Sequence, residues 1–312
     1  MICMFKLLRN FLIIFAFLFL FSFFTNSFEK LLNANFYFLF FAVLSYLISI
    51  IMWIFAWSLL IKSKYKLSFG KLFNIGFSSI VGSFTPVQLG VEALRVLQLK
   101  KSGVSIKDSV GASMLVKGSK FLIILLLAIF FSQPLLNSNY FFWILAGLFV
   151  IFLATLLFLL PLIPFLGYKI SKLFLSLSEI KYLNFLKKLS EYFLFYTDYL
   201  KNSANSLILI IFFLSTISWI FELLSLVFSF YSVGLLLKIN ILIYAAALIS
   251  ILERIPFLPR GIGLLEIICF YFFRTLNLKA SIIGAALVIF TFSRLIFPVL
   301  LSLIFNIQRE QA

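Results

Sequence analysis

Histidine is absent from this 312-residue chain, and cysteine occurs only twice. Without histidine the chain lacks the commonest general base near neutral pH and the commonest neutral metal ligand. The two cysteines, Cys3 and Cys269, lie far apart with no CxxC spacing, which indicates neither a zinc site nor a disulfide framework. We therefore expect no metal and no cofactor.

Acidic residues are also scarce. Only 10 residues are Asp or Glu, and charged residues make up 12% of the chain, whereas 64% are hydrophobic. A soluble domain of this size needs charged residues to cover its surface, so this composition excludes a soluble protein. Few acids are left for acid–base catalysis, and no P-loop, Rossmann glycine motif or nucleophile elbow occurs. These absences argue against an enzyme.

Long hydrophobic runs dominate what is present. A spanning helix needs about 20 apolar residues, and candidate spans lie at 7–24, 36–61, 109–131, 140–163, 207–233 and 281–304. These runs are continuous, unlike the alternating strands of about ten residues in a membrane β-barrel. The sequence therefore predicts an all-α, polytopic integral membrane protein, a single domain with about six full spans. The first run resembles a signal peptide but lacks an A-x-A cleavage site, so we interpret it as an uncleaved helix.

Basic residues outnumber acidic residues by 26 to 10, which gives a net charge of +16. Such an excess is typical of cytoplasmic loops that face anionic lipid, and no nucleic-acid-binding motif accompanies it. Lysine and arginine cluster at the N-terminus, around 62–71, around 95–107 and in the connector 164–206. We therefore expect a cell-membrane protein with both termini in the cytoplasm and no nucleic-acid partner.

The connector 164–206 alternates Leu, Phe and Tyr with Lys at helical spacing. This pattern predicts amphipathic helices that lie on the cytoplasmic face of the membrane. A plain basic loop is the alternative. We favour the helices because the apolar content is high for a loop.

Two short interruptions stand out within the hydrophobic sequence, at 86–92 and at 259–266. Each contains a proline, a glycine four residues later and a glutamate shortly after it. Pro86 and Pro259 are 173 residues apart, as are Gly90 and Gly263. The zones around them, 68–99 and 239–275, are each long enough for two short helices but lack one clean span. Paired Gly/Pro interruptions in two halves indicate the binding site of a transporter.

The same separation relates the spans. The span at 36–61 maps onto 207–233, and the span at 109–131 maps onto 281–304. We therefore predict two repeats, 36–131 and 207–304, each made of a span, a broken re-entrant hairpin and a span. The loop charges give the two copies opposite orientations, as in transporters that work by alternating access. The alternative is coincidence, since hydrophobic chains align with themselves at many offsets.

Charged residues lie inside the predicted spans. Lys117 and Lys120 are central in the third span and share a helix face, Arg294 is central in the last, and Glu222 is central in the fifth. The 173-residue separation maps Lys120 to within one residue of Arg294. A central Lys or Arg costs about 2.5–3.5 kcal/mol on insertion scales, so such residues mark functional sites. We predict a cationic pocket for an anionic headgroup, most simply a phosphate. The alternative is structural ion pairing of these cations with Glu222, Glu253 or Glu92.

The residues at the two hairpin tips are suited to binding an anion. Proline removes a backbone donor and glycine permits tight turns, so free N–H groups at the broken ends suit an anion. Glutamates near the tips are expected to stabilise the following helix N-terminus. Arg95 and Arg254 are expected to pair with Glu92 and Glu253 and to belong to the headgroup site. The candidate tip residues are Pro86, Gly90, Glu92, Pro259, Gly261, Gly263 and Glu266.

At these residues the chain resembles the lysylphosphatidylglycerol synthase transmembrane region, a flippase-like family. The first-half segment of that family matches Pro86, Gly90, Glu92 and Arg95, followed by Lys117. Its second-half segment, Pro-Gly-Gly-x-Gly-x-x-Glu, matches 259–266 and is followed by Arg294. Two departures occur: Arg260 replaces the usual first glycine, and Lys120 stands where relatives often carry an acid.

The resemblance covers nearly the whole chain and implies lipid translocation between membrane leaflets. We expect a translocase for an anionic phospholipid or a polyprenyl-phosphate-linked lipid. Its partners would be membrane lipids and a separate lipid-modifying enzyme, since we expect no attached synthetase domain. The alternatives are a membrane transferase for lipid-linked substrates, which would form a covalent product, and an accessory scaffold for a biosynthetic enzyme.

Overall fold

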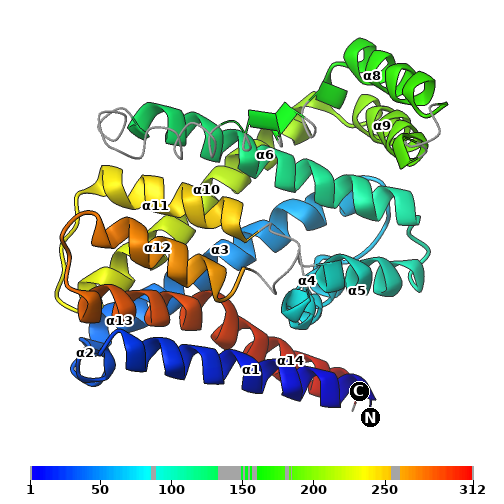
Figure 1. Cartoon of the computed structure of the whole chain (residues 1–312). Helices are drawn as coiled ribbons and strands as arrows, with labels where there is room; N and C mark the ends of the chain where they lie inside the picture. Colours follow the sequence, from blue (N-terminus) through cyan, green and yellow to red (C-terminus); the bar gives the residue numbers. More distant parts are fainter. Residues whose placement is uncertain are drawn as a thin grey trace.

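The computed structural model describes residues 2–85, 89–132, 149, 152–153, 155–156, 160–179, 183, 185–253 and 261–310. Within these residues the structure is helical and contains no strand (Figure 1). The elements in chain order are α1 (Ile2–Phe24), α2 (Phe28–Leu32), α3 (Phe36–Lys62), α4 (Phe69–Ser78), η1 (Ser79–Phe84), α5 (Leu89–Lys100), α6 (Ile106–Ser132), η3 (Leu160–Leu162), α8 (Pro164–Leu177), α9 (Phe185–Lys201), α10 (Asn205–Ser232), α11 (Ile239–Leu252), α12 (Leu264–Arg274), α13 (Ala280–Thr291), η4 (Phe292–Ile296) and α14 (Phe297–Glu310).

Four helical stretches among the described residues are long and apolar enough to cross a membrane: Phe36–Lys62, Ile106–Leu127, Asn205–Ser232 and Ala280–Ile304. They coincide with four predicted spans, and the protein is membrane-embedded. The apolar part of α1, Arg9–Phe24, is shorter than these four. Most of the span predicted at 140–163 lies outside the described residues.

The two interrupted zones each fold as a pair of short helices, as predicted. In the first zone α4 continues into the 3-10 turn η1, and α5 follows it; in the second, α11 is followed by α12. The order of a long helix, two short helices and a long helix therefore occurs twice, first from α3 to α6 and then from α10 to α14.

Helices α3 and α10 cross the middle of the molecule and form the most extensive helix contact among the described residues (Figure 1). Small buried side chains meet in this contact: the hydroxyl groups of Ser49 on α3 and Ser218 on α10 lie 3.0 Å apart, and Ser218 also donates a hydrogen bond of 3.0 Å to the Ser49 carbonyl. Small residues let membrane helices approach closely, where packing and polar contacts can hold them together. This pair therefore forms the central support for the charged side chains described below.

The connector contains two helices, α8 and α9, which pack against each other beside the bundle (Figure 1). The hydroxyl groups of Ser171 and Ser190 lie 2.9 Å apart between them. Gly167 lies so close to Thr197 that a Cβ atom there would be 2.1 Å from its hydroxyl oxygen. The helices predicted for the connector are thus present.

Candidate functional site

The tip of the first hairpin is closed by two glycines. A Cβ atom on Gly82 would lie 2.3 Å from the carbonyl carbon of Gly90, so only glycine permits this approach. The hydroxyl of Thr85 accepts a hydrogen bond from the Gly90 N–H at 2.6 Å and donates one to the Gly82 carbonyl at 2.8 Å. The tip residue Pro86 lies outside the described residues.

Glu92 follows this tip in the first turn of α5, as predicted. Its carboxylate forms an ion pair of 2.7 Å with the ammonium group of Lys117 on α6. Sequence reasoning had expected Arg95 as its ion-pair partner, and the structure corrects this. Arg95 shares a face of α5 with Glu92, but its fully buried guanidinium makes its close contacts with α3 and with Ser79.

The Arg95 guanidinium lies over two tryptophan rings of α3. Its central carbon is 3.9 Å from the Trp53 ring centre and 4.7 Å from that of Trp57. Its Nε donates a hydrogen bond of 3.0 Å to the Ser79 hydroxyl. A planar cation stacks favourably on aromatic rings, which explains why Arg95 is held here although it is buried.

The second tip also depends on glycine. Gly261 and Gly263 have positive φ angles of 69° and 90°, a region that other residues rarely adopt. The Gly263 N–H donates a hydrogen bond of 2.7 Å to the carboxylate of Glu266. Glu266 therefore caps the N-terminus of α12, and the predicted stabilising role is confirmed. Pro259 and Arg254 lie outside the described residues.

Arg294 lies in η4, a π-helical turn between α13 and α14. Pro298 follows four residues later and lacks the N–H that would bond to the Arg294 carbonyl, which accounts for a local change in helical winding at this point. The Arg294 guanidinium forms ion pairs with Glu253 at 2.7 Å and Glu266 at 3.3 Å. The Thr291 hydroxyl donates a hydrogen bond of 2.5 Å to Glu266. The arginine and Glu266 are both fully buried.

A third ion pair joins α6 and α10. The Lys120 ammonium lies 2.5 Å from the carboxylate of Glu222, which also accepts a hydrogen bond of 3.3 Å from the Ser49 hydroxyl. Ser49 in turn lies 3.0 Å from the Ser218 hydroxyl. Lys117 and Lys120 therefore share a helix face but reach partners on different helices.

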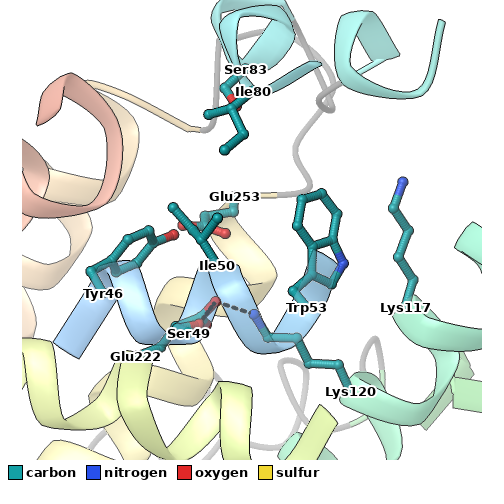
Figure 2. Close-up of a pocket in the computed structure, with 10 residues that line it drawn as sticks. All are labelled: Tyr46, Ser49, Ile50, Trp53, Ile80, Ser83, Lys117, Lys120, Glu222 and Glu253. Atoms are coloured by element: carbon teal, nitrogen blue, oxygen red, sulfur yellow. Dashed lines mark hydrogen bonds and ion pairs between the residues drawn. The ribbon is translucent and has the colours of Figure 1, made fainter. Parts of the chain in front are cut away.

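These groups surround a cavity (Figure 2). Its volume of about 40 Å³ is enough for a few water molecules. Figure 2 shows Lys120 pointing at Glu222, with Lys117 to one side and Glu253 next to Ile50. The lining residues are Tyr46, Ser49, Ile50, Trp53, Ile80, Ser83, Lys117, Lys120, Glu222 and Glu253.

Sequence reasoning missed the contribution of α3. Tyr46, Ser49 and Trp53 lie three and four residues apart, so they share one helix face toward the cavity. This spacing was visible in the sequence, but the charged positions drew the prediction to other helices. The hydroxyl groups of Thr85 and Thr291 were missed as well, because threonine within a hydrophobic run carries no distinctive signal.

The charged cluster is balanced. Arg95, Lys117, Lys120 and Arg294 contribute four positive charges, and Glu92, Glu222, Glu253 and Glu266 contribute four negative charges. The structural ion pairing that we weighed as an alternative is present, while headgroup binding stays a prediction. Among the described residues no group of three or more metal-ligating side chains is placed to hold a metal.

Comparison with known proteins identifies the family of this chain. No curated protein and no solved structure matches the chain. The family described as the lysylphosphatidylglycerol synthase TM region matches residues 8–302, which confirms the resemblance drawn from the two interrupted segments. The chain belongs to this family of lipid-related membrane proteins.

Proposed function

We propose that this protein translocates a lipid with an anionic, phosphate-bearing headgroup between the leaflets of the cell membrane. The headgroup engages Lys117, Lys120 and Arg294 in the charged cluster, and the hydrophobic tail stays in the bilayer. Two halves of the chain with opposite orientation alternate in opening the cluster to each side, and both termini are cytoplasmic. Family membership supports a lipid-related role, and the arrangement of ion pairs supports the mechanism.

Further sequence correspondences support two related halves. The separation of 173 residues that relates the two tips also relates Gly111 and Ala112 to Gly284 and Ala285. It relates Ser49 to Glu222 as well, and these two side chains are hydrogen-bonded at 3.3 Å. Equivalent residues meet only near an axis that relates the two copies. The contact between Ser49 and Glu222 is therefore expected if the two halves pack about a pseudo-two-fold axis.

The observation that carries the proposal is where each ion pair lies relative to the halves. The pair of Glu92 and Lys117 lies within the first half, and the pairs of Arg294 lie within the second. The pair of Lys120 and Glu222 connects the first half to the second. When the halves move apart, the pairs within each half persist, and the connecting pair separates.

A phosphate can take the place of the Glu222 carboxylate at Lys120, because both are anions that accept charge-assisted hydrogen bonds. Binding of the headgroup would then replace the connection between the halves and promote their movement. The present cavity of about 40 Å³ is much smaller than typical ligand pockets of about 300–1,000 Å³. The halves must therefore separate before a headgroup can enter.

Translocation in liposomes tests this proposal. Purified protein is reconstituted with a fluorescent anionic phospholipid, and the label in the outer leaflet is quenched chemically. We expect Lys120→Gln to slow translocation about tenfold or more, because a hydrogen bond to a charged group contributes about 1.5–3 kcal/mol. Lys66→Gln, which changes an exposed lysine away from the cavity, is the matched control.

The charge exchange Lys120→Glu with Glu222→Lys tests whether translocation needs the ion pair and a cation beside the cavity, or needs a lysine at position 120 itself. It restores the connecting ion pair and keeps a cation beside the cavity, so we expect it to recover part of the rate lost in Lys120→Gln. No translocation of any fluorescent anionic phospholipid by the wild-type protein contradicts the proposed function. A wild-type rate in Lys120→Gln contradicts the role given to this lysine.

A further inference from the structure

A second cavity, of about 540 Å³, lies between α1 and the beginning of α12. Helix α1 contributes Ile13, Ile14 and Phe17, and the start of α12 contributes Gly263 and Ile267. Asn10 is the polar side chain among the described residues of the wall. The volume lies within the range of ligand pockets, about 300–1,000 Å³.

The walls of this cavity suit a hydrocarbon and not a polar ligand. A buried water needs two to four polar partners, and a wall of isoleucine and phenylalanine provides few. Ile13 is 59% exposed and Ile267 is 43% exposed, so the apolar wall is accessible from the surface of the protein. Because this surface belongs to a membrane-embedded protein, the molecules that reach it carry acyl chains.

Gly263 leaves space at the wall. An added Cβ atom would find its nearest neighbour, Phe17, at 3.6 Å, an ordinary contact distance. No backbone segment therefore closes the cavity at this point, in contrast to the first tip, where Gly82 touches the backbone at Gly90. The two hairpins differ in this respect, and the second opens onto the apolar cavity.

The cavity lies beside one end of the charged cluster. Gly263 lines the cavity, and its N–H donates to Glu266 at 2.7 Å. Glu266 is paired with Arg294 at 3.3 Å. A lipid whose phosphate reaches the cluster thus has an apolar space for its tail beside Gly263, which donates a hydrogen bond to the carboxylate that holds Arg294.

We propose that this cavity between α1 and α12 binds an acyl chain of the translocated lipid. The inference rests on the proposed function and names the tail site that accompanies the headgroup site. Since bilayer and cavity are both apolar, the cavity aligns the tail through packing and contributes little through dehydration. Its effect is to hold the lipid beside the second hairpin while the headgroup exchanges with the ion pairs.

Photocrosslinking of the full-length wild-type protein tests the tail site. The protein is reconstituted with a phosphatidylglycerol that carries a diazirine on one acyl chain, and the labelled peptides are mapped by mass spectrometry. We expect labelling at 10–17 and 262–267 to exceed labelling at 209–213 at least threefold. The latter segment of α10 contains exposed Leu209 and Phe213 and serves as the reference for ordinary lipid contact.

Ile267→Trp fills the cavity, and Ile210→Trp adds the same bulk to an exposed position on α10. We expect the first variant to lose the labelling at 10–17 and to slow translocation, and the second to keep both. Uniform labelling of the wild-type protein overturns the tail site, whatever the translocation rate. Enriched labelling without translocation keeps the tail site and overturns the transport function, so the two failures are distinguishable.

Discussion

Replacing Glu266 with glutamine removes a buried carboxylate whose two oxygen atoms are both engaged. One oxygen accepts hydrogen bonds from the Thr291 hydroxyl at 2.5 Å and from Arg294 at 3.3 Å, and the other accepts from the Gly263 N–H at 2.7 Å. The glutamine amide has nearly the same shape, but one of its two ends is a donor. Whichever way the amide is turned, a donor faces another donor.

The expected cost follows from burial. Removing one partner of a buried ion pair costs about 3–5 kcal/mol, because the remaining charge is left without compensation. Arg294 keeps Glu253 at 2.7 Å, so the cost lies at the lower end, about 3 kcal/mol. Each kcal/mol lowers the melting temperature by about 2–4 °C in chains of about 150–250 residues, and by less in longer chains. For this chain of 312 residues we therefore expect a decrease of at most about 6–12 °C.

Lys120→Gln is the comparison, because it breaks an ion pair that borders the cavity. The Lys120 and Glu222 side chains are 12% and 20% exposed, whereas Arg294 and Glu266 are fully buried. Partial access to solvent weakens such a pair, so we expect a smaller cost than that of Glu266→Gln, which is about 3 kcal/mol. The assay is thermal unfolding of both variants, purified in the same detergent. Equal decreases for the two variants, or a larger decrease for Lys120→Gln, would refute the reasoning.

Three further predictions concern the hairpins and the cluster. Gly82→Ala forces a Cβ atom against the backbone of the first tip and is expected to cost about 1–3 kcal/mol or more in thermal unfolding, whereas Gly70→Ala, with open space around it, is expected to be neutral or slightly stabilising. Opposite orientation of the halves is tested with single cysteines at exposed Lys66 and Lys279, in a chain whose native cysteines are replaced by serine. We expect an impermeant maleimide to label position 66 from the cytoplasmic side and position 279 from the outer side. Labelling of both positions from the same side contradicts opposite orientation of the halves. Arg95→Lys loses the planar stack on two tryptophan rings and is expected to cost about 0.5–2 kcal/mol in the same thermal assay; an unchanged melting temperature contradicts that stabilising role.

The sequence predicted the ends of several helices to within a few residues. The span predicted at 36–61 is α3, Phe36–Lys62, and the span predicted at 207–233 is α10, Asn205–Ser232. The positions of the two short helix pairs were also predicted, because proline and glycine interrupt a hydrophobic run in a recognisable way. Membrane insertion imposes these features locally, since every backbone group in the bilayer must find a partner within the helix.

The tertiary structure decided which charged side chains form ion pairs with each other. Glu92 and Arg95 are neighbours on one helix turn, yet Glu92 pairs with Lys117 and Arg95 stacks on Trp53 and Trp57. Lys117 and Lys120 share a face, yet they contact different helices.

The sequence by itself determined that this is a helical membrane protein, where its helices break and which charged residues are exceptional. It contained no information on which carboxylate lies within about 3 Å of which cation, because ion pairs between helices depend on distances between segments that are far apart in the chain. Packing of α6 against α5 and α10, and of α12 against α13, brings these segments together. The resulting ion pairs make the charged cluster balanced, not cationic.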